Sequence, residues 1–406
     1  MTTLATYAEA REVFRARDLR QALYDEGHRL MEGVIVNLHG DAHLARRRLE
    51  NRLFRRDVFA WYERERIPAI IDHVLAPTIR DGHGDLLPLA RRTMVMLSID
   101  VAGVDVQSGS DAEFERFYAL MDRLAQASTV AHATGDKAAI VADGDEALAA
   151  FDVEFFRPSL DRRRTLVSEV ERGERDESEL RRDVLTTLVR NQDRLDLAPQ
   201  TVLREVAYFP WVGSHSTSNQ FVHAMHHIFE WLIDRPQDRQ RLLDDSVTLQ
   251  RFVHESLRLH PASPDALRRA VAPVVLRSGI TIAEDENVVI DIHAANRDPA
   301  AVGPHGDRFD PFRQMADGVA PWGLSFGHGA HACLGRELAG GLEPDEALDD
   351  HLLGSIVLMA GAVLRAGACP DRNDPPTVDT GTTRNNWGRY PVVLRRREES
   401  RRGVRR

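Results

Sequence analysis

The sequence predicts a mainly α-helical fold with a small β region, organised as a single domain over residues 1–406. Apolar residues recur at helical spacing through most of the chain, which favours helices. Segments rich in β-branched residues are short, and we expect β structure to be confined to the C-terminal half. No internal repeat and no Pro/Gly/Ser-rich linker divides the chain, so we predict one large domain although its length would allow two or three.

Composition excludes several classes of protein. Hydrophobic residues make up 43% of the chain and charged residues 29%, which indicates a globular protein rather than a disordered one. The net charge of −10 argues against nucleic acid as a partner. No apolar run reaches the length of a membrane span and no signal-like segment opens the chain, so we expect no membrane anchor. Two cysteines, Cys333 and Cys369, cannot form a disulfide framework, and we therefore expect a cytoplasmic protein.

Helices are expected to dominate the first half of the chain. Their predicted ranges are residues 7–23, 43–56, 59–75, 112–134 and 176–194. The most distinctive helix follows, with Pro199 in its first turn and Asp234 at its end. Roughly 36 residues would span about 54 Å, enough to cross the molecule. Pro210, Gly213 and several hydroxyls make its middle poor helix material, so we expect a kink where a ligand could bind.

The C-terminal half holds the expected strands and a long coil. Strands are predicted over residues 273–276, 280–282 and 287–292. The coil from residue 297 to residue 335 is rich in Pro, Gly, Asp and Arg. A structureless coil of this length is uncommon inside a domain, so we expect a cofactor to organise it.

The end of this coil carries the strongest chemical signal. Gly327, Gly329 and Gly335 permit tight turns and the close approach of a flat surface, and a helix is expected to begin at Arg336. Cys333 would then stand at a helix N-terminus, where a thiolate, a soft metal ligand, is favoured. A buried structural cysteine is the ordinary role of a single Cys, and the surrounding residues argue against it.

This loop resembles the haem-binding loop of the cytochrome P450 family, F-x-x-G-x-x-x-C-x-G. Phe326, Gly329, Cys333 and Gly335 occupy its fixed positions, and Gly327 matches the longer form. The resemblance implies a cytochrome P450 fold with haem b (heme b, iron protoporphyrin IX) between the long central helix and the cysteine loop. It also implies that Cys333 is the axial thiolate ligand of the iron.

Two further motifs occur in the family's order. Glu255-Ser-Leu-Arg258 resembles the E-x-x-R motif, and the resemblance implies a buried structural triad with Arg313. Alone, such a pair three residues apart on a helix would be read as a solvated surface pair. Residues 295–299 and 309–313 supply the sequence that accompanies the motif in the family. The triad is expected to serve folding and haem retention rather than chemistry.

Four residues resemble the family's ligands for the haem propionates. His43 and Arg47, four apart on one helix face, match the H-x-x-x-R motif, and charge-assisted bonds to carboxylates are strong. A solvated basic helix is the alternative, because several other arginines surround them. Arg268 aligns with a further propionate arginine, although Arg269 could take that role. His331 is the fourth candidate.

Three histidines on the long helix offer a different metal site. His223 and His227 have the i,i+4 spacing of a zinc pair, and His226 lies beside them. The Glu of H-E-x-x-H and a third ligand are missing from the pattern, so we disfavour a zinc site.

The central helix and the N-terminus depart from the family pattern. The family's A-G-x-(Asp/Glu)-Thr supplies an acid and an alcohol that deliver protons to bound dioxygen. Aligned on Gly213, the acid position holds His215 and the alcohol position Ser216, and these three are our candidate catalytic residues. Serine keeps a hydroxyl and histidine can relay protons, while a structural role for His215 stays open. Because few residues precede Tyr7, we expect the family's first helix and leading strands to be missing.

The resemblance implies an oxidoreductase, namely a P450 monooxygenase that oxidises a small organic molecule, such as a secondary metabolite, with O₂. Ferredoxin and ferredoxin reductase would supply electrons, because the chain lacks a dinucleotide loop and a cysteine cluster of its own. The Arg-rich face that includes Arg336 is the expected docking face for the ferredoxin. Because His215 replaces the acid, a non-standard P450 is the alternative: a peroxygenase, or an enzyme of coupling, nitration, dehydration or rearrangement. A non-catalytic haem sensor or carrier is the third hypothesis.

Overall fold

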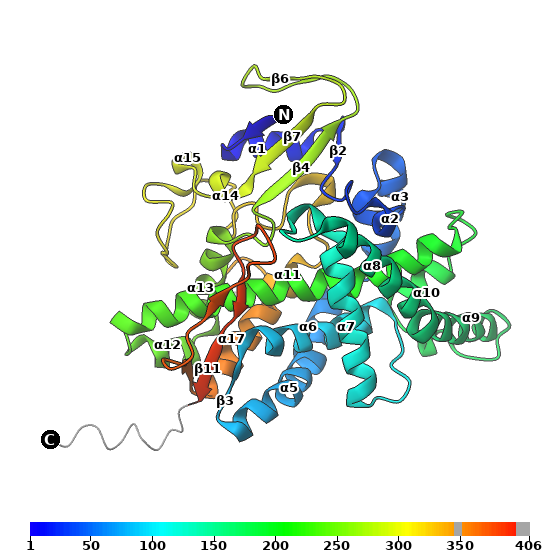
Figure 1. Cartoon of the computed structure of the whole chain (residues 1–406), viewed down its shortest axis with the longest axis horizontal. Coiled ribbons are helices and arrows are strands. Elements are labelled where there is room, and N and C mark those ends of the chain that lie inside the picture. The colour runs from blue at the N-terminus through cyan, green and yellow to red at the C-terminus, as the bar shows by residue number, and fades with distance from the viewer. Residues whose placement is uncertain (345–350, 395–406) are drawn as a thin grey trace.

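The computed structural model describes residues 1–344 and 351–394, and most of them are helical (Figure 1). The α-helices of this part are α1 (Tyr7–Arg15), α2 (His28–Met31), α3 (Gly40–Glu50), α4 (Arg56–Trp61), α5 (Ile67–Asp81), α6 (Leu86–Ala102), α7 (Asp111–Ser128), α8 (Lys137–Phe151), α9 (Arg157–Glu171), α10 (Val184–Val189), α11 (Pro199–Asp234), α12 (Asp238–Asp244), α13 (Ser246–Leu259), α14 (Ile292–Ala295), α15 (Pro299–Val302), α16 (Arg336–Gly340) and α17 (Ser355–Arg365). None of the helices in the described ranges combines the length and the apolar character that crossing a bilayer requires.

The strands are short and lie at two places in the molecule. They are β1 (Thr2–Leu4), β2 (Leu19–Gln21), β3 (His83–Asp85), β4 (Asp265–Ala270), β5 (Val274–Val275), β6 (Thr281–Ile282), β7 (Asn287–Asp291), β8 (Ala368–Pro370), β9 (Thr377–Val378), β10 (Trp387–Arg389) and β11 (Pro391–Leu394). The largest sheet has the order β1-β7-β4-β2, in which only the β1–β7 pairing is parallel. A second sheet has the order β3-β11-β8, and β10-β9 and β5-β6 form two-stranded pairs.

Strand β4 turns one face toward the interior. Its burial alternates along the strand, so Ala266, Arg268 and Ala270 are buried while the residues between them are more exposed. The side chain of Arg269 therefore lies on the opposite face from that of Arg268. This alternation places one arginine inside the protein, next to the loop that contains Cys333.

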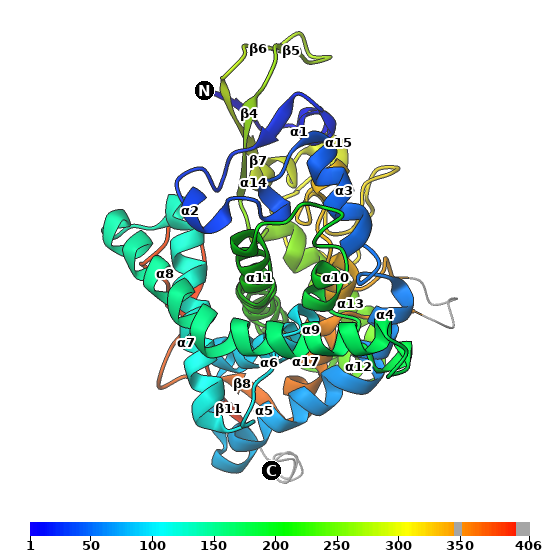
Figure 2. The same cartoon turned by 90° about the vertical axis from the view of Figure 1, so that its right-hand side faces the viewer.

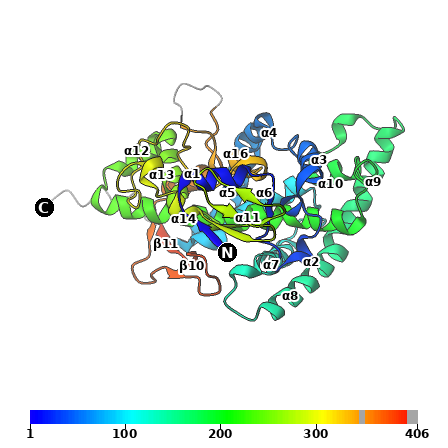
Figure 3. The ribbon, with the colours of Figure 1, turned by 90° about the horizontal axis from the view of Figure 1, so that it is seen from above.

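Helix α11 is the central element, with 36 residues that match the predicted range (Figure 1). Figure 2 looks along it, and the view from above in Figure 3 places the four-stranded sheet and α1 over its middle. One apolar core packs its C-terminal half against α5, α6, α13 and α17. A second core packs its N-terminal half against α7, α8 and α10, and a third fills the space between the sheet and α1. Cores at both ends hold α11 in place.

The proline, glycine and hydroxyl-bearing residues in the middle of α11 do not interrupt the helix. The helix continues through Pro210. The hydroxyls of Ser214, Ser216 and Ser218 donate to the carbonyls of the residues four positions earlier, at 2.6, 2.8 and 2.6 Å. These bonds keep the polar side chains on the helix itself, which is how hydroxyls are tolerated inside a helix.

Two π-helical turns mark the points where a proline follows. Tyr62–Arg66 joins α4 to α5 and Asp152–Phe156 joins α8 to α9, and Pro68 and Pro158 stand just after them. Proline has no N–H to bond to the carbonyl four residues earlier. The backbone widens at that point to bonds between residues five apart. The helices thereby continue through the prolines.

The structure corrects three expectations for the first half of the chain. β structure is not confined to the C-terminal half, because β1, β2 and β3 lie within the first 85 residues. The expectation that no strand of the sheet precedes Tyr7 is wrong, since Thr2 pairs with Val288 of β7. The predicted helix over residues 7–23 ends at Arg15 and is followed by β2. Three-residue strands carry no periodic signal, and only their distant partners β4 and β7 make them strands.

Candidate functional site

The loop around Cys333 is built from left-handed glycines and backbone bonds. Gly327 and Gly329 adopt φ angles of 66° and 73°. A Cβ on Gly329 would lie 2.5 Å from the carbonyl oxygen of Phe14, so the loop can approach α1 only with glycine there. The Cys333 N–H donates to the Phe326 carbonyl at 2.9 Å. This bond closes the loop and fixes where Cys333 stands.

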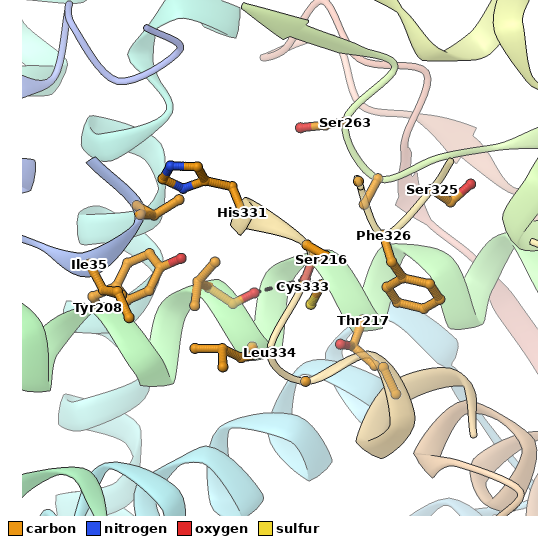
Figure 4. A pocket seen from close by; sticks show the side chains of 18 of the residues that line it. Ile35, Tyr208, Ser216, Thr217, Ser263, Ser325, Phe326, His331, Cys333 and Leu334 are labelled. Carbon is orange, nitrogen blue, oxygen red and sulfur yellow. Dashed lines mark hydrogen bonds between the residues drawn. The ribbon is translucent and has the colours of Figure 1, made fainter. Parts of the chain in front are cut away.

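Cys333 faces a cavity between its loop and α11 (Figure 4). Its side chain is accessible, and the surface that it exposes lines this cavity. Phe326 and Leu334 come from the loop, and Ser216 and Thr217 from the helix. The α11 residues that line the cavity are Tyr208, Phe209, Val212, Gly213, Ser216, Thr217 and Gln220. The wall is otherwise mostly apolar, with Met94 and Leu97 of α6 among its members.

Four basic side chains converge on the same cavity. His43 and Arg47 reach it from α3, Arg268 from β4 and His331 from the cysteine loop. The rings of His43 and His331 stack with centroids 3.8 Å apart. The Arg47 guanidinium donates to the Ala332 carbonyl at 2.6 Å, which ties α3 to the loop. The four residues that the sequence singled out separately are therefore brought together.

Burial lowers the pKa values of these side chains. It lowers the pKa of His43 to about 4 and that of His331 to about 3, because the charged imidazolium is desolvated. Burial also lowers the pKa of Arg268 to about 10. The Arg268 guanidinium donates to Gln21 Oε1 and to a backbone carbonyl. The positive charge of Arg268 is thus held in a buried site. A bound anion of suitable shape would compensate for the desolvation of the guanidinium.

The environment of Cys333 corrects one expectation from the sequence. The pKa of its thiol is raised, because burial outweighs the Gly335 N–H and the charges of Arg47 and Arg336, which lower it. Proximity to the N-terminus of α16 alone therefore does not favour the thiolate. A metal ion bound at the sulfur would favour the thiolate.

Three comparisons with known proteins agree on the family. A family model described as Cytochrome P450 matches residues 230–340. This segment begins near the end of α11 and includes the Glu255–Arg258 motif and the Cys333 loop. Over this segment the chain is similar to the cytochrome P450 family.

Two curated relatives match parts of this chain. The "Mycinamicin IV hydroxylase/epoxidase" of Micromonospora griseorubida is 35% identical over 160 residues, 39% of this chain and 38% of that protein. The "Vitamin D(3) 25-hydroxylase" of Pseudonocardia autotrophica is 39% identical over 108 residues, 27% of this chain and 25% of that protein. The matched segments thus span less than two thirds of either relative.

The fold is also that of solved P450 structures. The crystal structure of epothilone D-bound cytochrome P450epoK superposes with a TM-score of 0.73 over 97% of this chain and 91% of that chain, at 19% identity. The mainly α-helical P450 fold expected from the sequence is confirmed. At this level of identity, the likeness concerns the fold alone.

The family implies a haem, and the residues at the cavity fit one. Arg47 and Arg268 form no ion pair with a carboxylate of residues 1–344 or 351–394, and two haem propionates would supply the missing charges. Nε2 of His43 is buried and lacks a hydrogen-bond partner within the described ranges. A Cβ on Gly335 would meet no atom within 4 Å, so this glycine leaves room at the cavity wall.

The three residues singled out on α11 occupy different places. Ser216 lines the cavity with Cys333, and so does Gly213, whose Cβ, if present, would lie 2.9 Å from Ser98 Oγ of α6. Gly213 therefore also permits the close approach of α6. His215 does not line this cavity, because one residue along a helix turns the side chain by about 100°. It lines an adjoining cavity, where its Nε2 lies 2.9 Å from Asp122 Oδ1 of α7.

The E-x-x-R triad forms as the resemblance implied. Arg258 donates to both carboxylate oxygens of Glu255, at 2.6 and 2.7 Å. Arg313 reaches the same carboxylate at 3.3 Å. Arg258 is fully buried and also donates at 2.7 Å to two backbone carbonyls, those of Asn296 and Gly306. The triad therefore ties α13 to the long coil.

The three histidines considered for zinc pack against aromatic rings instead. His223 stacks on His260, His227 on Phe309, and His226 lies against Trp387. No group of three or more potential metal ligands occurs within residues 1–344 and 351–394. The three imidazole rings thus take part in packing between α11 and its neighbours.

Sequence reasoning missed several residues of the two cavities. Gln21 and Tyr24 reach the haem cavity from β2 and the turn that follows it, and Asp122 binds His215 from α7. Arg384 enters the adjoining cavity from the C-terminal coil. None belongs to a motif, and no local signal would have found them.

Proposed function

We propose that this P450 is a monooxygenase that inserts one oxygen atom from O₂ into a small organic substrate, with haem b as its prosthetic group. The observation that supports this most is the position of Cys333. Its sulfur is accessible to a largely apolar cavity, with two α11 hydroxyls and four basic side chains around it. When bound, a thiolate-ligated haem supplies O–O bond cleavage.

The other roles in this proposal are assigned to residues of the chain. Cys333 is the ligand of the iron, and His43, Arg47, Arg268 and His331 bind the propionates. The apolar wall contributed by α6 and α11 excludes water from the reacting centre. The Ser216 hydroxyl donates to the Val212 carbonyl at 2.8 Å. Its oxygen therefore remains free to accept a hydrogen bond from a water molecule.

Electrons are proposed to come from a ferredoxin served by ferredoxin reductase. Arg336, at the start of α16, is partly exposed on the cysteine-loop side, where its guanidinium lies 5.6 Å from the Trp322 ring centroid. An arginine held in this way offers a positive contact to an acidic carrier.

Replacement of the two cysteines tests the proposal. In the haem-loaded protein, Cys333→Ala should abolish the thiolate-type Soret band of the reduced CO complex and all O₂-dependent turnover. Cys369→Ala is the matched control and should keep both, because Cys369 lies on β8 and does not line the cavity that contains Cys333. A thiolate-type band that persists in Cys333→Ala would refute the ligand assignment.

A second candidate, non-standard P450 chemistry, rests on His215. The usual acid is absent, and its replacement binds Asp122 rather than facing Cys333. Turnover with peroxide in the absence of electron carriers would favour a peroxygenase or a related coupling, nitration, dehydration or rearrangement enzyme. Failure to turn over with any oxidant would favour a haem sensor or carrier.

A further inference from the structure

A second cavity adjoins the one that contains Cys333. The two share the lining residues Tyr24, Val212, Ser216, Ala262 and Ser263. Ser216 and Ser263 are both among the residues labelled in Figure 4. A substrate in the haem cavity therefore lies next to the second cavity, with these shared residues between them.

The two cavities differ in chemical character. The wall near Cys333 is dominated by aliphatic and aromatic side chains. The adjoining cavity is lined by many polar groups, among them Asn219, Asn386, Thr382, Gln126 and Arg384. An occupant of both would need an apolar body near the cysteine and a polar end beyond it.

Most charged groups of the second cavity are already engaged. Asp122 accepts from His215 at 2.9 Å, from Gln126 at 2.8 Å and from Arg91 at 3.2 Å. Asp379 accepts the Gly381 N–H at 2.9 Å. Asp122 and Arg91 are thus engaged in an ion pair, and Asp379 has a backbone partner.

Arg384 is the exception. It forms no ion pair with any residue in the ranges 1–344 and 351–394, and its buried Nε has no hydrogen-bond partner there. Burial lowers its pKa despite the opposing influence of Tyr24 and Asp265. A guanidinium always carries its charge in proteins, so this cation lies desolvated beside a cavity without a counter-ion.

We propose that Arg384 anchors a carboxylate of the substrate, whose apolar body extends past Ser216 into the haem cavity. This inference rests on the proposed monooxygenase function and names its substrate class, an organic acid oxidised at a carbon away from its carboxylate. The planar fork of arginine suits bidentate pairing with a carboxylate. The anchor fixes which end of the substrate enters the haem cavity.

Two other roles for Arg384 are less consistent with its surroundings. A counter-ion for Asp265 would stand in direct contact with it, yet Asp265 lines the haem cavity and the two form no ion pair. A residue that binds a haem propionate would line the haem cavity, as Arg47 and Arg268 do. Arg384 does not line that cavity.

The test is a spin-state titration of the holoprotein with carboxylic acids and their methyl esters, covering aliphatic and aromatic bodies. At neutral pH at least one acid should bind roughly tenfold more tightly than its ester, the ratio expected when one charge-assisted pair is lost. Arg384→Gln should bring this ratio close to one, and Arg384→Lys should keep part of it. Arg269→Gln, a surface arginine paired with Asp285, is the matched control and should keep it fully.

Each contrary outcome is decisive. If no acid is preferred to its ester by the wild-type protein, or if Arg384→Gln keeps the preference, the carboxylate anchor is refuted. If Arg384→Gln loses haem as Arg268→Gln does, Arg384 is a propionate ligand and the inference is wrong. A missing thiolate-type CO band in the wild-type protein would instead refute the proposed function, so the two failures are distinguishable.

Discussion

Arg268 and Arg269 are neighbours on β4 with opposite surroundings. The Arg268 side chain is buried beside the cavity, and Phe14 packs against its guanidinium at 5.3 Å. Arg269 is exposed and pairs with Asp285 at 3.2 Å. The alternation of a strand turns the second arginine away from the site, and the register of β4 with β7 decides which of the two points inward.

Arg268→Gln should therefore weaken haem retention. Loss of a charge-assisted bond costs about 1.5–3 kcal/mol, which corresponds to roughly 10- to 100-fold faster haem loss. Transfer of haem to apomyoglobin measures the rate. Arg269→Gln should transfer haem at the wild-type rate, and equal rates for both variants would contradict the assignment of Arg268.

His215 is the second residue whose surroundings decide its role. Its Nδ1 lies 3.2 Å from the Trp211 carbonyl and its Nε2 2.9 Å from Asp122, so α7 and α11 are joined through one ring. Burial lowers the pKa of His215, while Asp122 raises it. A carboxylate placed at 215 would face Asp122 and repel it.

His215→Asp should consequently lower both stability and coupling instead of restoring standard chemistry. The loss of a hydrogen bond to a charged group costs about 1.5–3 kcal/mol of unfolding free energy. Denaturant unfolding and the ratio of product to NADH consumed are the measurements. Asp122→Asn in the same chain should recover part of the stability, and a more stable single variant would show that the two side chains do not meet.

At the scale of secondary-structure elements, two faces of helix α11 line two different cavities because of the helical period. Gly213, Ser216, Thr217 and Gln220 follow the spacing of one helix face and line the cysteine cavity. His215 lies about 100° away from Ser216 and lines the second cavity. Ser216, at the alcohol position of the family pattern, thus lines both cavities, whereas His215, at the acid position, lines the second cavity and not the first.

A cluster of neutral histidines lies between the C-terminal part of α11 and the end of α13. Burial lowers the pKa of His223 to about 4, of His227 to about 3 and of His260 to about 2. His227 bonds to Ser256 at 2.9 Å, which ties α11 to α13. Below the unfolded-state pKa of about 6.5 the unfolded chain takes up protons that the folded chain does not, so stability falls with falling pH.

The unfolding free energy should decrease by about 1.4 kcal/mol per pH unit for each such histidine below about pH 6.5, until the folded-state pKa is reached. Denaturant unfolding at about pH 7 and about pH 5.5 measures the slope. His260→Phe should reduce the slope by one proton while keeping a ring against His223. His73→Gln, on the exposed face of α5, should leave it unchanged. The same slope in both variants would refute the contribution of His260.

For the whole molecule, the Glu255 triad is the main polar link between the helical body and the long coil. Arg258 donates to Glu255 and to the backbone at Asn296 and Gly306, while Arg313 donates to Pro304 and His305 carbonyls. These bonds organise the coil that leads to the cysteine loop. They do so without any direct contact with the haem cavity.

Glu255→Gln should destabilise the whole protein by about 3–5 kcal/mol, because Arg258 would remain buried without its counter-charge. Thermal unfolding and the fraction of chains that retain haem measure the effect. Glu179→Gln removes a surface pair with Arg175 and is the control, with no measurable change expected. Full stability of Glu255→Gln would contradict the structural role of the triad.

The sequence by itself determined the mainly helical fold, the extent of α11 and the identity of the cysteine loop. Those features depend on local signals: helical periodicity, prolines at helix ends, and glycines at fixed distances from a cysteine. The residues of each motif are close in sequence, so one segment contains the whole signal. Spacing within a helix likewise predicted that Glu255 and Arg258 would meet.

Only the tertiary structure decided which distant groups meet. β1 and β2 are strands because β7 and β4 lie beside them, and His215 binds Asp122 because α7 crosses α11 at that point. Arg384 acquires its role from a cavity whose walls come from remote parts of the chain. The physical reason is that burial and contact depend on packing between elements, which no local pattern of residues records.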